Sequence, residues 1–271
     1  MSKRRKGLLA ALFGIIVVTT TASLQGSAVA QPVHRASWHM IWNDEFGGAT
    51  LNTHKWNAEY IASPRNNELE YYIPRNAVVR GGHLSIISKH ESYQGQDYTS
   101  AAIDTYQKFS FTYGKVVIRA KLPQMGQGIW PALWMEGTGC NPVGSPCPWP
   151  LNGANEIDIL EAINTPSTMY MTPHWGSELY TDLNTSSCTF GGVDFSAAYH
   201  TFSMVWKPGG LIDWYVDGVQ RCERSIPGYF HDPMYLIFNT AIGGSFPGNP
   251  DATTPFPQSY DIDYVRVYQS N

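Results

Sequence analysis

Short stretches in which apolar and polar residues alternate recur along the chain after residue 30, and they predict β-strands. In residues 115–122 the even positions are apolar and the odd positions are mostly charged, which is the period of a strand with one buried face. Apolar and aromatic runs, broken by Gly, Pro and Asn, predict further strands at residues 83–88, 201–206, 212–216, 234–239 and 262–268. Asp217-Gly218 directly follows one of these runs and predicts a tight hairpin turn.

The number and length of these runs indicate an all-β fold. No long segment after residue 30 has a helical period. Many short strands with frequent turn signals favour an antiparallel sandwich or barrel. Residues 31–271 contain no repeat and no Ser/Gly-rich linker, so we expect one domain. Because this segment is much longer than an immunoglobulin domain of about 100 residues, the pattern predicts a larger jelly roll.

The first 30 residues have the pattern of a cleaved secretory signal peptide. Four basic residues at positions 3–6 precede an apolar run at residues 7–18, and Ala28-Val29-Ala30 forms a small-residue cleavage site. A membrane anchor is the alternative, but the run is shorter than the roughly 20 residues that span a bilayer. We therefore expect residues 31–271 to be a secreted, extracellular protein without membrane association.

Removal of this segment makes the chain more acidic. The formal net charge moves from −4 to −8, because the segment contains four basic residues and no acidic ones. An acidic chain lacks the basic patch that nucleic acid or anionic lipid requires, so neither is expected as a partner.

Four cysteines are expected to form disulfides. In an exported protein an even number of cysteines indicates disulfides, and four cysteines allow three pairings. We favour Cys140–Cys147, which closes a short Pro/Gly-rich loop, and with it Cys188–Cys222. Free thiols are the alternative, and no cysteine or histidine spacing indicates zinc.

The stretch NEIDILEAIN, residues 155–164, places three acids in an apolar strand. Glu156 and Asp158 are two residues apart and share one face of a strand. Glu161 is three residues further on, so on a regular strand it points to the other face. A β-bulge at residues 159–160 would return Glu161 to the first face, and bulges are frequent beside active sites. A calcium site and a solvated strand face are the alternatives.

Such a cluster has the requirements of glycoside hydrolysis. With the bulge, Glu156 and Glu161 lie about four regular steps apart, roughly 13 Å along the strand. Side chains that lean together across this span would approach the separation of about 5–5.5 Å that retaining glycosidases need. Repulsion among three acids separates their pKa values, so that one is an ionised nucleophile and another a protonated general acid.

Aromatic residues surround the acids in the sequence, and aromatic rings suit the apolar faces of sugars. Core packing is the alternative role for some of them. The candidates are Trp130, Trp134, Trp149, Trp175, Tyr71, Tyr72 and Tyr106.

With these motifs, the chain resembles glycoside hydrolase family 16, and within it the laminarinase-like branch. The stretch EIDILE (156–161) is similar to the bulged E-x-D-x-x-E motif of that family. The resemblance covers nearly all of residues 38–269. It is carried, in order, by WNDEF (42–46), NNELEYY (66–72), GGHLSI (81–86), GKVVIRAKLP (114–123), WPALWM (130–135), HTFSMVWKPGGLIDWYVDG (200–218) and DYVRVYQ (263–269).

The resemblance implies a concanavalin-like β-jelly roll of two curved antiparallel sheets with an open cleft, and endo-hydrolysis with retention of configuration. It implies Glu156 as nucleophile, Asp158 as its assistant and Glu161 as acid/base, with no cofactor for catalysis. Matched substrate-binding positions are Asn66, Trp130, Trp134 and His174. A structural calcium away from the cleft is implied, with Glu45, the Gly82 backbone and Asp263 as its ligands.

The chain departs from the family pattern at several positions. Asn155 stands where Gly is common, Ala102 where Arg is frequent, Pro173 where Leu is usual and Phe246 where Trp is common. Ala102 and Phe246 match positions near the sugar-binding subsites, and the insert at residues 137–150 is expected near the cleft.

We expect a secreted, monomeric, retaining endo-β-1,3-glucanase whose polysaccharide substrate is laminarin-like. Mixed-linkage glucan or a β-galactan is the alternative substrate for the same chemistry. A carbohydrate-binding, lectin-like domain would not need the three acids, and a transglycosylase would share them.

Overall fold

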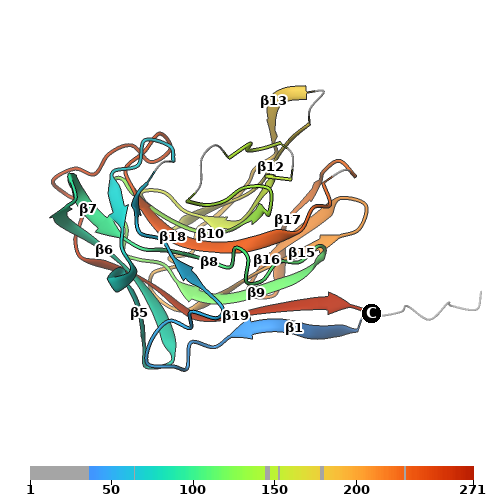
Figure 1. The fold of residues 1–271 in the computed structure, drawn as a ribbon, viewed down its shortest axis with the longest axis horizontal. Helices are drawn as coiled ribbons and strands as arrows, with labels where there is room; N and C mark the ends of the chain where they lie inside the picture. Colours follow the sequence, from blue (N-terminus) through green and yellow to red (C-terminus); the bar gives the residue numbers. More distant parts are fainter. Residues whose placement is uncertain (1–36, 64, 144–146, 152, 178–179, 229) are drawn as a thin grey trace, which may run out of the picture. The chain divides into compact units, whose positions relative to one another are not determined.

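Two β-sheets stack face to face in the computed structural model of this chain. It describes residues 37–63, 65–143, 147–151, 153–177, 180–228 and 230–271. The predicted signal peptide, residues 1–30, lies outside the described residues. Figure 1 shows the sheets as curved layers, with β10 and β18 in one and β9 and β19 in the other.

The larger sheet has eleven strands. Its order is β17 (Val219–Ser225), β16 (Leu211–Val216), β15 (His200–Lys207), β9 (Gly114–Lys121), β19 (Gln258–Ser270), β6 (His83–Tyr93), β7 (Gln96–Ser100), β4 (Glu70–Tyr72) and β3 (Ile61–Ala62). In addition, β1 (Trp38–Asp44) pairs with β19, and β5 (Ala77–Arg80) pairs with β6 after the 3₁₀ turn η1 (Pro74–Asn76).

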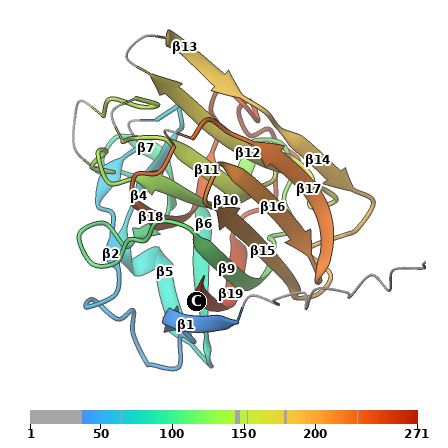
Figure 2. The same ribbon diagram turned by 90° about the vertical axis from the view of Figure 1, so that its right-hand side faces the viewer.

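The smaller sheet has eight strands and carries the acids. Its order is β13 (Tyr180–Thr185), β12 (Thr168–Ser177), β11 (Glu156–Glu161), β10 (Ile129–Gly137), β18 (Met234–Ile242), β8 (Ala102–Asp104) and β2 (Asn57–Ala58), with β14 (Cys188–Gly191) paired to β12. Figure 2 shows β11 between β10 and β12.

The strands predicted from the alternating pattern are confirmed. Of residues 115–122, all but Leu122 fall in β9, where the even positions are buried and the odd positions partly exposed. The hairpin is confirmed as well, because Val216 pairs with Val219 across Asp217 and Gly218. Both turn residues have positive φ angles of 50° and 77°, as a two-residue hairpin turn requires.

The core lies between the two sheets. β11 contributes Ile157, Ile159 and Leu160, and the opposite sheet contributes Trp206 and Trp214, all at most 1% exposed. Apolar burial on this scale is the main stabilising contribution to such a sandwich. It leaves the other face of the smaller sheet free to carry polar side chains.

One strand pairing departs from the expected antiparallel pattern. β4 pairs with β7 in parallel orientation, through Glu70–Tyr98, Tyr71–Thr99 and Tyr72–Ser100. The chain between these strands runs through η1, β5 and β6, which is long enough for the crossover that a parallel pair requires.

Both predicted disulfides are present. Cys140 is bonded to Cys147, and Cys188 on β14 is bonded to Cys222 on β17, which joins the two sheets. Within the described residues, no helix has the length and apolar character of a membrane span.

Candidate active site

The three acids of β11 share one face because the strand contains a bulge. Across β12, Asp158 pairs with Thr172 and Glu161 with Tyr170, so two residues of β11 oppose one residue of the neighbour. The pairing with β10 shifts at the same place. The bulge predicted from the spacing of the acids is confirmed.

The opposite sheet supports this bulge directly. The indole Nε1–H of Trp214, on β16, donates a hydrogen bond of 2.9 Å to the backbone carbonyl of Asp158. A bulge interrupts the ladder of backbone hydrogen bonds, and a buried carbonyl without a partner is costly. Trp214 therefore satisfies the backbone where the strand changes its register.

A cleft of about 600 Å³ lies over this face of the smaller sheet. Alternate residues of β10, β11, β12 and β18 form its floor, and connections between strands form its walls. The floor residues are Trp130, Ala132, Trp134 and Glu136; Glu156, Asp158 and Glu161; Tyr170, Thr172 and His174; and Asn239 and Ala241. The described walls include Arg65, Asn66, Glu68, Cys140, Asn141, Pro142, Cys147, Trp149 and Phe246.

Each acid has a distinct set of partners. Glu156 Oε2 accepts a 2.6 Å hydrogen bond from the indole N–H of Trp149, and Glu161 Oε1 accepts a 2.9 Å bond from Trp130. His174 Nε2 lies 3.0 Å from Asp158 Oδ2 and 3.8 Å from Glu156 Oε1. The Nδ1 atom of His174 has no partner in the described part of the chain, so its contacts with the acids are made through Nε2.

Burial raises the pKa of all three acids. Burial and then the charge of Asp158 raise the pKa of Glu156 well above its ordinary value. Burial and then the charge of Glu161 do the same for Asp158, which is in hydrogen-bond contact with both glutamates. The pKa of Glu161 is also raised by burial, against the opposing effects of His174 and the Trp130 N–H. These raised pKa values favour a protonated carboxyl within the cluster.

All four residues matched to substrate-binding positions line the cleft. Asn66 is at its rim, with a φ angle of 49°. Trp130 and His174 contact the acids directly. Trp134 is only 8% exposed, because its N–H is bonded to Asn239 and Arg65 lies over its ring. Trp134 is thus a floor residue rather than an open stacking platform.

Three of the seven aromatic candidates line the cleft, and four do not. Trp130, Trp134 and Trp149 line the cleft. Trp175 packs against the core, Tyr72 is fully buried, Tyr106 packs behind Trp134, and Tyr71 contacts Tyr60 and Tyr93. Sequence proximity to the acids does not distinguish the two faces of a strand, which is why these four were misplaced.

The two substitutions expected near the subsites differ in position. Phe246 is 44% exposed and lines the cleft, with its ring 5.5 Å from Trp130 and 5.3 Å from Tyr170. Ala102, by contrast, is 1% exposed in β8 and does not line the cleft. The insert at residues 137–150 borders the cleft, as expected, through Cys140, Asn141, Pro142, Cys147 and Trp149.

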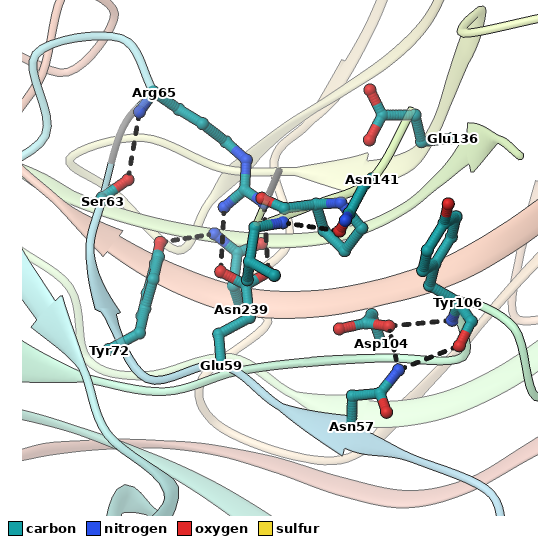
Figure 3. Close-up of polar contacts among 12 residues, drawn as sticks. Asn57, Glu59, Ser63, Arg65, Tyr72, Asp104, Tyr106, Glu136, Asn141 and Asn239 are labelled. Carbon is teal, nitrogen blue, oxygen red and sulfur yellow. Dashed lines mark hydrogen bonds and ion pairs between the residues drawn. The ribbon is translucent and has the colours of Figure 1, made fainter. Parts of the chain in front are cut away.

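Three charged residues that line the cleft, Arg65, Glu68 and Glu136, were not predicted from the sequence. Arg65 pairs with the buried carboxylate of Glu59 at 3.0 Å and donates to the carbonyl of Pro142 at 2.9 Å. Figure 3 shows this guanidinium beside Glu59 and Asn141, with Glu136 further along the cleft. Glu136 is two residues after Trp134 on β10 and therefore lies on the same face of the strand as Trp130 and Trp134. This two-residue period was sufficient to predict that Glu136 faces the cleft. Arg65 lies in an irregular connection, where no period exists.

The residues predicted to bind calcium do not form a ligand set as arranged. The carboxylate of Glu45 accepts two hydrogen bonds from Arg266, and that of Asp263 is paired with Arg119. Neither carboxylate belongs to a cluster of three His, Cys, Asp or Glu side chains among the described residues. A cation would have to displace both arginines, so these residues do not fit calcium in this arrangement.

Two other groups bring three ligand-type atoms within 4.8 Å of one another. Glu136, Cys140 and Cys147 form one, but both sulfurs are joined in a disulfide and offer no thiolate. Glu156, Asp158 and His174 form the other, which is the acid cluster itself.

The comparison with protein families decides the identity of this site. The model described as "Glycosyl hydrolases family 16" matches residues 51–266, which include every acid of the cluster. The chain belongs to glycosyl hydrolase family 16. The predicted all-β jelly roll of two sheets is confirmed by the solved structures of this family.

Named members of family 16 are similar over most of this chain. The Glucan endo-1,3-beta-glucosidase A1 of Niallia circulans is 36% identical over 86% of this chain, and the Beta-glucanase of Rhodothermus marinus is 36% identical over 86%. This chain spans 38% of the first enzyme's length and 85% of the second's. The catalytic domain of an endo-1,3-beta-glucanase (laminarinase) from Thermotoga petrophila is 38% identical, with a TM-score of 0.76 over 88% of this chain and 100% of that one.

Proposed function

We propose that this chain is a secreted, retaining endo-β-1,3-glucanase that hydrolyses laminarin-like glucan. The observation that carries the proposal is the bulged strand β11, which presents Glu156, Asp158 and Glu161 together in the cleft of a family 16 chain. The names of its relatives, endo-1,3-β-glucanases among them, support the substrate class.

The proposed reaction is a double displacement. Glu156 attacks the anomeric carbon as the glycosidic C–O bond breaks, and Glu161 gives its proton to the leaving oxygen. Glu161 then takes a proton from a water molecule, which attacks the same carbon and releases Glu156. The Trp130 N–H bonded to Glu161 keeps this carboxyl oriented toward the leaving oxygen in both steps.

Asp158 is proposed to assist Glu156 as a proton donor. It is 1% exposed and burial raises its pKa, which favours a protonated carboxyl that donates a hydrogen bond to a neighbouring glutamate. His174 Nε2 lies 3.0 Å from Asp158 Oδ2 and is a second hydrogen-bond partner of this carboxyl. A proton on Asp158 would limit the negative charge of the cluster in the reacting state, in which Glu156 must be ionised although burial raises its pKa.

Endo-action follows from the form of the cleft. It lies across four strands of an open sheet face, and a polymer can cross β11 with sugar units on either side. The disulfides and the N-terminal pattern support export, and we further propose that the mature chain acts as a monomer. Mass spectrometry of the culture medium and light scattering test these two points.

Product analysis tests the proposed function. The mature protein is incubated separately with laminarin, curdlan, mixed-linkage glucan, β-1,3-galactan, agarose and carrageenan. Short laminari-oligosaccharides from the first two substrates are expected. Products only from a galactan would overturn the substrate, and a folded protein that is inactive on all six would overturn the enzymatic proposal.

A further inference from the structure

The nucleophile of the proposed reaction has a hydrogen-bond partner outside the sheet. Trp149 lies in the connection between β10 and β11, and its N–H is 2.6 Å from Glu156 Oε2. Its ring is 5.8 Å from that of His174, whose Nε2 faces the other carboxylate oxygen at 3.8 Å. The carboxylate of Glu156 thus accepts a hydrogen bond from this connection and has a longer, 3.8 Å contact with His174 on β12.

Contacts on both sides of the cleft anchor this connection. On one side, the Pro142 carbonyl accepts a 2.9 Å bond from Arg65, whose charge is balanced by Glu59. On the other side, the Pro150 carbonyl, next to Trp149, accepts a 3.1 Å bond from the backbone N–H of Gly176 on β12. The Cys140–Cys147 disulfide joins a residue before Pro142 to a residue just before Trp149 in the same connection. Trp149 therefore has a defined position although it belongs to no strand.

Gly176 lies close to this connection. A β-carbon on Gly176 would lie 2.6 Å from Leu151 Cδ2, the end of a flexible side chain, and 3.4 Å from Pro150 Cγ, so the connection packs closely against β12.

We propose that Trp149 is a positioning residue for Glu156, held in place by the Arg65 and disulfide anchors of the β10–β11 connection. This inference rests on the proposed function. An N–H bond to a carboxylate favours its ionised form, which is the form that attacks. The same bond stabilises Glu156 when it departs from the glycosyl-enzyme in the second step. Trp149 thereby offsets the charges that face Glu156, which are Asp158 and Glu161 on β11 and Glu136 on β10.

The test compares Trp149→Phe, which keeps an aromatic ring without the donor, with Trp38→Phe as matched control. Both tryptophans are 38% exposed, but Trp38 lies on β1 and does not line the cleft. For Trp149→Phe we expect kcat on laminarin to fall by about 10- to 100-fold, the scale of one charge-assisted hydrogen bond. The acid limb of the kcat/KM pH profile should move up by about one pH unit. The control should retain the wild-type profile.

The pH profile shows whether Trp149 positions Glu156 or only lines the cleft. If Trp149 only bordered the cleft, its replacement would raise KM and leave the acid limb unchanged, and that result would overturn the inference. The double variant Cys140→Ala, Cys147→Ala keeps the indole but removes the covalent anchor. In this double variant we expect the acid limb of the kcat/KM pH profile to move up by less than in Trp149→Phe. An unchanged acid limb would refute the role of the disulfide in holding Trp149. Wild-type inactivity on every glucan would instead indicate failure of the proposed function.

Discussion

Glu136 on β10 lies directly opposite Glu156 on β11, and both side chains line the cleft. Burial raises the pKa of Glu136 to about 7, against the effect of a 2.8 Å hydrogen bond from the Tyr235 hydroxyl. The nucleophile therefore faces a carboxyl group that changes its charge near neutral pH. This pair links the stability of the fold to the electrostatics of the site.

Glu136→Gln should increase stability at alkaline pH and not at acidic pH. The folded-state pKa of about 7 exceeds the ordinary value of 4.5, so folding favours the protonated form. Wild-type stability then falls as pH rises from about 4.5 through about 7, by at most about 3 kcal/mol. Thermal unfolding at pH 4.5 and pH 8.5 measures this difference. An equal gain in stability at both pH values would contradict the proposed dependence of stability on the ionisation of Glu136.

Glu156→Gln and Glu161→Gln should fail at different steps. Glu156→Gln should abolish turnover of every substrate, because no nucleophile remains, while folding and oligosaccharide binding are retained. Glu161→Gln should lose laminarin hydrolysis but still release an activated phenol in a burst, because that leaving group needs no proton. Stopped-flow measurement with an aryl laminaribioside distinguishes them. Full activity of Glu156→Gln would refute its assignment as nucleophile.

Trp214→Phe should weaken both the fold and the site. It removes the donor to the Asp158 carbonyl at the bulge, at a cost of about 1–3 kcal/mol in the free energy of unfolding. The matched control is Trp206→Phe, because Trp206 is equally buried and its N–H has no partner in the described part of the chain. Urea unfolding and kcat should both show the larger loss for Trp214→Phe. Equal effects of the two substitutions would mean that the hydrogen bond is unimportant.

Chelation should not destabilise the protein. Glu45 and Asp263 are paired with Arg266 and Arg119, which supply the positive charge that a calcium ion would otherwise provide. The melting temperature with EDTA should agree within about 1 °C with that in millimolar calcium. A clear rise with calcium would show that the two ion pairs open to admit the metal.

The sequence was sufficient to predict much of the strand pattern and the three acids. Alternation in β9 and the Asp217-Gly218 turn are local signals, and the misfit of Glu161 with its neighbours had only one simple explanation, a bulge. Resemblance to a family supplied the roles of the acids and the surrounding tryptophans. These features depend on residues that are close together in the chain.

Other features of the site depend on contacts between distant segments. Arg65 is held by Glu59 and by the carbonyl of Pro142, which is 77 residues away in the chain. No local sequence pattern predicts this long-range contact. The bond between Trp149 and Glu156 depends on the course of an irregular connection. Tyr72 and Trp175 were misplaced because a tyrosine or tryptophan suits a buried core as well as a sugar-binding surface.

The stereochemistry of the first product tests the central claim most directly. Proton NMR can follow the anomeric signals during hydrolysis of a reduced laminari-oligosaccharide, before mutarotation mixes the anomers. Double displacement at Glu156 predicts that the β-anomer appears first and the α-anomer grows only later. Initial release of the α-anomer would show inversion by a single displacement, and would contradict a covalent intermediate on Glu156.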